Sequence, residues 1–78
     1  MYYVYILKLN NEDLYTGFTD DLKRRVNEHK LGKVQTTLKN LPIKLIWYSC
    51  FLDKKKALEF EKYLKSSSGF SFRNKRLV

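Results

Sequence analysis

The order of apolar and polar positions predicts three short strands in this chain. Residues 2–9, YYVYILKL, are rich in aromatic and β-branched side chains and end at the polar cluster NNED, which indicates a strand followed by a hairpin turn. A second short strand is expected over residues 14–18, and a third over residues 43–51 after Pro42. Alternation along the first strand then divides its side chains between two faces, with Tyr3, Tyr5 and Leu7 on one face and Tyr2, Val4 and Ile6 on the other.

A helical period follows the second strand. We expect this helix to begin at Thr19, whose hydroxyl is a suitable cap, with the two following aspartates in its first turn, where the helix dipole favours negative charge. It should run to about Lys30 and end at Gly32. Residues 31–42 have no clean period, and we expect a loop there with about one turn of structure.

Another helix is expected over residues 54–65, KKKALEFEKYLK, with Asp53 as its cap. The serine run at residues 66–68 is interpreted as a loop that ends this helix, and residues 71–78 as a short third helix that packs back. Together these elements predict an α+β fold, in which a small, mainly antiparallel three-stranded sheet is flanked by helices. A chain of 78 residues has room for one small domain, spanning residues 1–78.

The apolar content excludes several classes of protein. The longest apolar run, residues 45–52, is far shorter than the ~20 residues that a membrane-spanning helix needs, and no basic leader precedes an apolar segment, so we expect a soluble, cytoplasmic protein. The single cysteine, Cys50, rules out an intramolecular disulfide or a cysteine metal site. Because it lies inside the apolar run, we expect a buried thiol.

The charge balance points to a polyanionic partner. Sixteen Lys and Arg against eight Asp and Glu leave a formal net charge of +8, and nucleic acid is the first candidate for such a surface; a merely soluble basic surface is the alternative. The basic side chains that we expect to contact a nucleic-acid backbone are Lys23, Arg24, Lys33, Lys39, Arg73, Lys75 and Arg76.

Five residues are predicted to converge on one surface: Tyr5, Tyr15, Arg25, His29 and Glu61. Glu61 is the most informative of them, since it lies about 40° from Ala57 around the second helix, inside the apolar arc. A carboxylate taken out of water needs a cation, which a divalent metal would supply; a structural ion pair with Arg25 is the alternative. The tyrosines alone would be typical of a core, and a lone histidine of a packed or surface residue.

This set of residues suits phosphodiester hydrolysis. That reaction needs a deprotonated water, positive charge on the non-bridging oxygens and stabilisation of the leaving oxygen. One carboxylate with a hydrated Mg²⁺ or Mn²⁺, an arginine, and a tyrosine whose pKa nearby cations lower would meet these needs. Gly17, which shares a face with Tyr15, is expected to clear space for a ligand or a packed helix.

On these residues the sequence resembles the GIY-YIG endonucleases. Residues 3–5, Tyr-Val-Tyr, correspond to the first motif of that family and residues 15–17, Tyr-Thr-Gly, to the second, while DLKRRVNEH supplies the arginine and histidine and ALEFEKYLK the glutamate. The resemblance covers nearly the whole chain and is greatest to the small stand-alone members. It implies that Glu61 binds the metal, Arg25 steadies the phosphate, and Tyr5 and Tyr15 position or deprotonate water with help from His29. Which tyrosine is the base stays open.

The chain departs from the family pattern in three respects. Tyr3 occupies the position of the first glycine, where it either fills space at the edge of the sheet or narrows the site. Many members carry an asparagine near the end of the domain, for which Asn74 is the candidate here and a further nucleic-acid contact. Family nucleases with known targets mostly have a separate DNA-binding domain, and none is expected in this sequence, so a protein partner is a candidate source of target recognition.

The resemblance therefore predicts a metal-dependent endonuclease, with DNA more favoured than RNA as the substrate. The main alternative is a nucleic-acid-binding module with the same fold that no longer cuts. A protein-interaction domain, in which the five residues form a buried polar network, fits the charge of +8 less well. The oligomeric state stays open.

Overall fold

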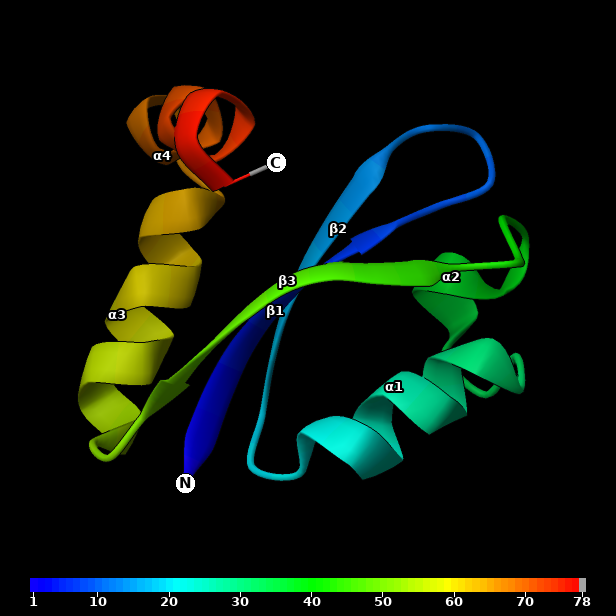
Figure 1. Cartoon of the computed structure of the whole chain (residues 1–78), viewed down its shortest axis with the longest axis horizontal. Helices are drawn as coiled ribbons and strands as arrows, with labels where there is room; N and C mark the ends of the chain where they lie inside the picture. Colours follow the sequence, from blue (N-terminus) through cyan, green and yellow to red (C-terminus); the bar gives the residue numbers. More distant parts are fainter. Residues whose placement is uncertain (78) are drawn as a thin grey trace.

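The computed structural model describes residues 1–77 and has three strands in the order β2-β1-β3. β1 (Tyr2–Lys8) lies in the centre and pairs antiparallel with both β2 (Leu14–Thr19) and β3 (Lys44–Phe51). Helices lie on both sides of this sheet, as Figure 1 shows. The α+β fold with an antiparallel three-stranded sheet is therefore confirmed, and the expected strands agree with the observed ones to within one residue at each end.

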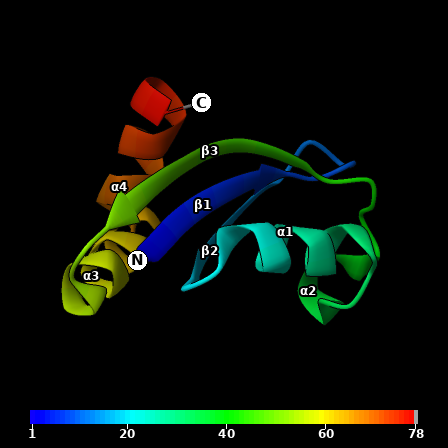
Figure 2. The same cartoon turned by 60° about the horizontal axis from the view of Figure 1, so that its bottom comes forward.

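The helices form two groups, one on each face of the sheet (Figure 2). α1 (Leu22–Lys30) and the single turn α2 (Gln35–Leu38) lie on one side. On the other side are α3 (Lys54–Leu64) and α4 (Ser67–Phe72), which continues into the π-helical turn η1 (Arg73–Leu77). Among residues 1–77, no helix is both long and apolar enough to cross a membrane.

Alternation along β1 builds a separate core on each face. Tyr5 and Leu7 pack with Val26 of α1 on one side, while Val4 and Ile6 pack on the other side with α3. All four of these β1 side chains are at most 1% exposed, so the central strand is buried on both faces. This is the division of faces that the sequence predicted.

The β1–β2 hairpin puts the two tyrosine motifs in register. Tyr5 is opposite Gly17, and Leu7 is opposite Tyr15. Paired residues of an antiparallel ladder point to the same face, so Tyr5, Tyr15 and Gly17 all lie on the face that α1 covers.

α1 begins two residues later than the sequence suggested. Its N-cap is Asp21, whose Oδ1 accepts a hydrogen bond from the backbone N–H of Arg24 at 3.1 Å. Thr19 is the last residue of β2 instead, and its hydroxyl oxygen accepts from the backbone N–H of Asp21 at 3.0 Å. The hydroxyl thus turns the chain between strand and helix, and the carboxylate two residues on caps the helix.

The end of α1 at Gly32 is confirmed, and its geometry is that of a Schellman motif. Gly32 has a φ of 77°, a left-handed conformation that costs glycine little. Its N–H donates to the carbonyl of His29 at 3.1 Å, and the N–H of Lys33 donates to that of Glu28 at 2.9 Å. The reversal directs the following segment back along α1 and places α2 beside it.

The sequence predicts a loop for the serine run at residues 66–68. This prediction is wrong, because α4 begins inside the run at Ser67. The Ser66 hydroxyl donates to the carbonyl of Tyr63 at 2.6 Å and accepts from the N–H of Gly69 at 3.2 Å, which links the end of α3 to the start of α4. A Cβ at Gly69 would overlap the Tyr63 carbonyl, so the glycine lets the two helices meet. The predicted helical C-terminus packs back through Leu77.

β3 is an edge strand, and its cysteine is not buried as the sequence predicts. Cys50 is exposed, although it lies within an apolar run. It is opposite Tyr3 in the ladder and so shares the face of α1, as does Tyr48, opposite Tyr5. Tyr48 is 55% exposed, which shows that α1 does not cover this part of the face. Sequence hydropathy cannot distinguish an apolar edge strand from a buried one.

Candidate active site

The site is built at the edge strand β2, where the ring of Tyr5 crosses Gly17. A Cβ at Gly17 would overlap the Cζ and Oη atoms of Tyr5. The space beside the glycine is therefore filled by the phenol of the neighbouring strand, and not by the ligand or helix that the sequence suggested. The lack of a side chain at Gly17 lets Tyr5 extend over β2 and place its hydroxyl at the edge of the sheet.

α1 brings His29 to this hydroxyl. The side chain of His29 is fully buried, and its Nε2 lies 3.0 Å from Oη of Tyr5. The ring of Tyr15 stands edge-on to the imidazole, with the ring centres 5.1 Å apart, and the rings of the two tyrosines are 6.4 Å apart. The structure thus brings together three of the residues that the sequence had grouped.

Thr37 of α2 completes this cluster, and the sequence analysis missed it. Its Oγ1 lies 2.8 Å from Nδ1 of His29, and its hydroxyl donates to the carbonyl of Val34 at 3.4 Å. Thr37 is fully buried. No sequence signal pointed to it, because its segment has no clean period and the contact depends on the chain reversal at Gly32.

Arg25 lies one turn before His29 on α1, where it joins the phenol of Tyr5 and a neighbouring carboxylate. Its Nη1 donates to Oε1 of Glu28 at 3.1 Å, and its side chain, 36% exposed, lies near enough to Tyr5 for each group to shift the pKa of the other. The interaction with Glu28 raises the pKa of Arg25, and the interaction with Tyr5 raises it further. Burial has the opposite effect but is outweighed. Arg25 is therefore a fixed positive charge beside the Tyr5 hydroxyl.

Glu61 lies on the other face of the sheet and acts on Tyr5 through its charge. It lies on α3, and its side chain is only 19% exposed. Its Oε2 accepts a hydrogen bond from Nζ of Lys65 at 3.0 Å, and the alternative ion pair with Arg25 is not among the salt bridges of residues 1–77. Its charge still acts on Tyr5, whose pKa it helps to raise. Groups from both faces therefore act on one phenol at the β2 edge.

The acid–base properties of the site differ from the sequence expectation. Burial raises the pKa of Tyr5 to about 12, and the nearby Tyr15 adds to this effect, whereas the hydrogen bond and charge of Arg25 lower it. We had expected nearby cations to lower a tyrosine pKa, but burial outweighs the arginine here. Burial and the charge of Arg25 lower the pKa of His29, and the charge of Glu28 opposes them. Both groups are therefore neutral at neutral pH.

The donor set fits a hard divalent cation held mainly by water. Among residues 1–77, no three His, Cys, Asp or Glu side chains come together as a metal-binding group. Glu61 offers a single, largely buried carboxylate that is paired with Lys65. Mg²⁺ and Mn²⁺ suit such a site, because they take oxygen ligands, and Mg²⁺ commonly binds through one or two carboxylates, several waters and substrate phosphates.

A hollow of about 310 Å³ lies next to Arg25, between the start of α3, the end of β2 and α1. Its lining combines the stacked rings of Tyr2 and Phe18 with cationic side chains. One of these, Lys54, was not predicted, although its spacing of seven residues from Glu61 puts both on one side of α3. The full lining is Tyr2, Phe18, Thr19, Asp20, Arg24, Arg25, Glu28 and Lys54.

The predicted backbone contacts divide into three groups. Arg73 is only 4% exposed and donates from Nη1 to Oγ1 of Thr16 at 3.1 Å, so it lies in the interior and not on the binding surface that we expected. Arg24 is exposed, but it makes ion pairs with Asp20, Asp21 and Glu28. The remaining six are exposed: Lys23, Lys33, Lys39, Asn74, Lys75 and Arg76.

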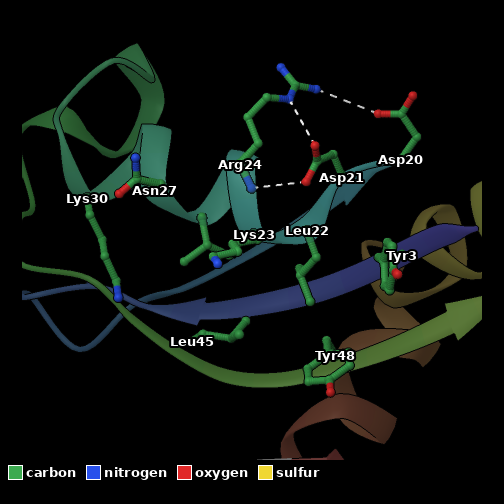
Figure 3. A pocket seen from close by; sticks show the side chains of 11 residues that line it. Tyr3, Asp20, Asp21, Leu22, Lys23, Arg24, Asn27, Lys30, Leu45 and Tyr48 are labelled. Carbon is green, nitrogen blue, oxygen red and sulfur yellow. Dashed lines mark hydrogen bonds and ion pairs between the residues drawn. The ribbon is translucent and has the colours of Figure 1, made fainter.

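Tyr3 does not narrow the site. It lines a larger and shallower hollow of about 980 Å³ between α1 and the β1–β3 half of the sheet. Figure 3 shows this hollow, with Leu22 of α1 pointing towards Tyr48 of β3 and the side chain of Lys30 reaching from α1 towards the sheet. The residue that replaces the family glycine thus contributes to a surface separate from the Tyr5–His29 cluster.

Comparison with known proteins identifies the family and the fold of this chain. The model of the family described as the GIY-YIG catalytic domain matches residues 1–76. A solution NMR structure of a UPF0213 protein from Bacillus halodurans is similar in fold, with a TM-score of 0.61 and 30% identity, over 99% of this chain and 87% of that one.

Several similar proteins are also named UPF0213 proteins. A UPF0213 protein from Haloquadratum walsbyi is 41% identical over 66 residues, which is 83% of this chain and 74% of the relative. Another from Streptococcus agalactiae is 39% identical over 67 residues, or 85% and 76% of the two chains. A third, from Clostridium perfringens, is 41% identical over 66 residues, or 83% and 71%.

Proposed function

Because this chain belongs to the GIY-YIG family, among the small UPF0213 proteins, we propose that it is an endonuclease. In this proposal it hydrolyses phosphodiester bonds of nucleic acid, preferably DNA, with a divalent metal ion, Mg²⁺ or Mn²⁺. One observation carries the proposal: three groups act on the hydroxyl of Tyr5. His29 is its hydrogen-bond partner, and the charges of Arg25 and Glu61 shift its pKa in opposite directions.

Tyr5 is the proposed base, because its proton has an acceptor. With a pKa of about 12, the phenol keeps its proton at neutral pH and cannot act as a free phenolate. Its Oη lies 3.0 Å from Nε2 of His29, which is neutral and able to accept. As the Tyr5 oxygen takes a proton from the attacking water, its own proton passes to His29, and the hydroxide formed attacks phosphorus.

Two charged residues act on the phosphate in this proposal. Arg25 donates to the non-bridging oxygens, for which a guanidinium is suited by its planar set of donors. Glu61 would hold the metal ion, which when bound supplies positive charge to the phosphate and to the leaving oxygen. Tyr15 packs against His29 and Tyr5 and keeps both rings in place.

The substrate strand is proposed to pass along the β2 edge. The hollow beside Arg25 carries Lys54 at its α3 side, so the phosphates next to the scissile one would meet a second cation there. The net charge of +8 supports binding to a polyanion and supplies attraction at long range. The exposed basic residues of α1, the segment after it and η1 are further candidates for such contacts.

The alternative remains a nucleic-acid-binding module of the same fold that does not cut. Cleavage assays with matched variants separate the two. Purified protein is incubated with labelled single-stranded, duplex and branched DNA and with RNA, in Mg²⁺ or Mn²⁺. Glu61→Gln and Tyr5→Phe are compared with Glu59→Gln, which changes an exposed carboxylate of the same helix.

We expect cleavage by the wild type and by Glu59→Gln, and a loss of at least about a hundredfold in Tyr5→Phe and Glu61→Gln. A chelator should stop the reaction. Binding without any cleavage, with the same salt dependence in the wild type and both site variants, would favour the binding module. Activity that survives equally in all variants would point to a contaminating nuclease.

A further inference from the structure

The buried hydrogen bonds around His29 form a chain that has one direction. It runs from Tyr5 through His29 and Thr37 to the carbonyl of Val34. The carbonyl of Val34 can only accept, so the single hydrogen of the Thr37 hydroxyl is used there. With its own hydrogen on Val34, Oγ1 of Thr37 can only accept from Nδ1–H of His29, and the neutral imidazole then presents its bare Nε2 to Tyr5.

This direction decides which nitrogen of His29 carries the hydrogen. Tyr5 donates to Nε2 at 3.0 Å, Nδ1–H donates to Oγ1 of Thr37 at 2.8 Å, and the Thr37 hydroxyl donates to Val34 at 3.4 Å. In the opposite tautomer, Nε2–H would point at the Tyr5 oxygen, and the phenol hydrogen would lose the acceptor that it has here. Leaving a buried donor without a partner costs about 1–3 kcal/mol, so the Nδ1–H tautomer is preferred.

We propose that Thr37 is a positioning residue that holds His29 in the Nδ1–H tautomer and so leaves Nε2 free to accept the proton of Tyr5. The side chains of His29 and Thr37 are fully buried, so water does not replace the threonine as the partner of Nδ1. α2 supplies the threonine: it follows the reversal at Gly32, and both the N–H and the hydroxyl of Thr37 bond to Val34. The catalytic consequence rests on the proposed nuclease function, whereas the tautomer does not.

Nitrogen NMR of the imidazole tests the tautomer directly. His29 is the single histidine of the chain, so one pair of ring ¹⁵N signals belongs to it without further assignment. We expect Nδ1 to be protonated and Nε2 unprotonated in the wild type at neutral pH. A wild-type spectrum with the hydrogen on Nε2 would overturn the proposal, whether or not the protein cuts nucleic acid.

Two substitutions test the role of the threonine. Thr37→Val keeps the shape of the side chain and removes the acceptor, and Thr37→Ser keeps the hydroxyl. We expect Thr37→Val to lose the pure Nδ1–H state and to lower kcat about 10- to 100-fold with KM little changed, by analogy with the loss of the partner that orients a metal-bound histidine. Thr37→Ser should restore both the tautomer and kcat.

The measurements separate a loss of the fold from a loss of the correct His29 tautomer. Amide spectra of both variants show whether the fold is intact, and the wild-type tautomer is measured on the unaltered protein. An intact Thr37→Val protein that keeps both the Nδ1–H state and the wild-type kcat contradicts the proposal. If the wild type cuts no substrate, the proposed function fails by itself, and the ring signals of the three proteins still decide whether Thr37 sets the tautomer.

Discussion

At the scale of residues, Gly17 and Tyr5 act as one unit. The glycine belongs to the edge strand and the tyrosine to the central one, and the ring fills the space that a side chain would occupy. The phenol hydroxyl can therefore contact His29 beyond the strand. The charges of Arg25 and of Glu61, which lies on the opposite face, both act on its pKa. The second family motif thus has a direct physical function: its glycine gives the tyrosine of the first motif access to the edge of the sheet.

His29 makes stability depend on pH in a defined direction. Its pKa in the folded protein lies below the ordinary value of 6.5, because burial and Arg25 disfavour the charged ring, so below pH 6.5 the unfolded chain binds more protons than the folded one. The contribution of neutral His29 is complete above pH 6.5 and is lost as the pH falls towards the folded pKa. We expect the free energy of unfolding, measured with urea, to decrease over this range.

The matched control for this pH effect is His29→Gln, which cannot gain the proton. The difference between the wild type and this variant should be constant above pH 6.5 and should shrink as the pH falls below it. A difference that stays constant from pH 7 down to pH 5 would contradict the assignment of His29 as a buried neutral ring. The amide of glutamine can still hydrogen-bond, which limits the structural change.

At the scale of elements, α1 carries Arg25 and His29 of the proposed site, and its start depends on Asp21. The carboxylate accepts from the backbone N–H of Arg24, whereas the neighbouring Asp20 belongs only to the exposed ion pairs of Arg24. We expect Asp21→Ala to lower the free energy of unfolding by about 1 kcal/mol, the usual effect of removing a helix cap. Asp20→Ala should change it by less than about 0.5 kcal/mol.

Chemical denaturation of the two alanine variants measures this difference. Both changes remove one negative charge from the same turn, so the general electrostatic effect is the same in each. Equal losses in the two variants would mean that Asp21 acts through surface charge and not as the cap. The result bears on function as well, because an earlier or frayed start of α1 would move Arg25 relative to Tyr5.

At the scale of the whole molecule, the two faces of the sheet contribute different parts of the site and meet at the β2 edge. α1 brings Arg25 and His29 from one side, and α3 brings Glu61 and Lys54 from the other. A strand of nucleic acid that lies along this edge would contact both helices. The net charge of +8 attracts it from any direction, so only local contacts can define its path.

Salt-dependent binding tests this path. Lys54→Ala and Lys56→Ala remove the same charge from the first turn of α3, but their side chains point about 200° apart around the helix. We expect Lys54→Ala to reduce the slope of log K against log salt by about 1, as for the loss of one phosphate contact, while Lys56→Ala leaves it nearly unchanged. Fluorescence anisotropy with labelled DNA without metal, which prevents cleavage, measures both. Equal slopes in the two variants would place the strand elsewhere.

The sequence alone determined most of the elements and proposed the members of the candidate site. Period-2 and period-3.6 patterns are local, so the strands, the two long helices and the ends at Gly32 and Asp53 followed from neighbouring residues. The five residues Tyr5, Tyr15, Arg25, His29 and Glu61 were grouped because their faces could be worked out from these periods and from the resemblance to the family. Charge in turn indicated a polyanionic partner.

Only the tertiary structure decided how these residues meet. Contacts between segments that are distant in sequence decide the role of Thr37 and the burial of Arg73. The position of a strand at the edge of the sheet decides the exposure of Cys50 and the crossing of Gly17 by Tyr5. The pKa of Tyr5 was likewise misjudged, because the balance between burial and a nearby cation depends on the depth of the site. Local pattern specifies the direction in which a side chain points, whereas packing specifies what it meets there.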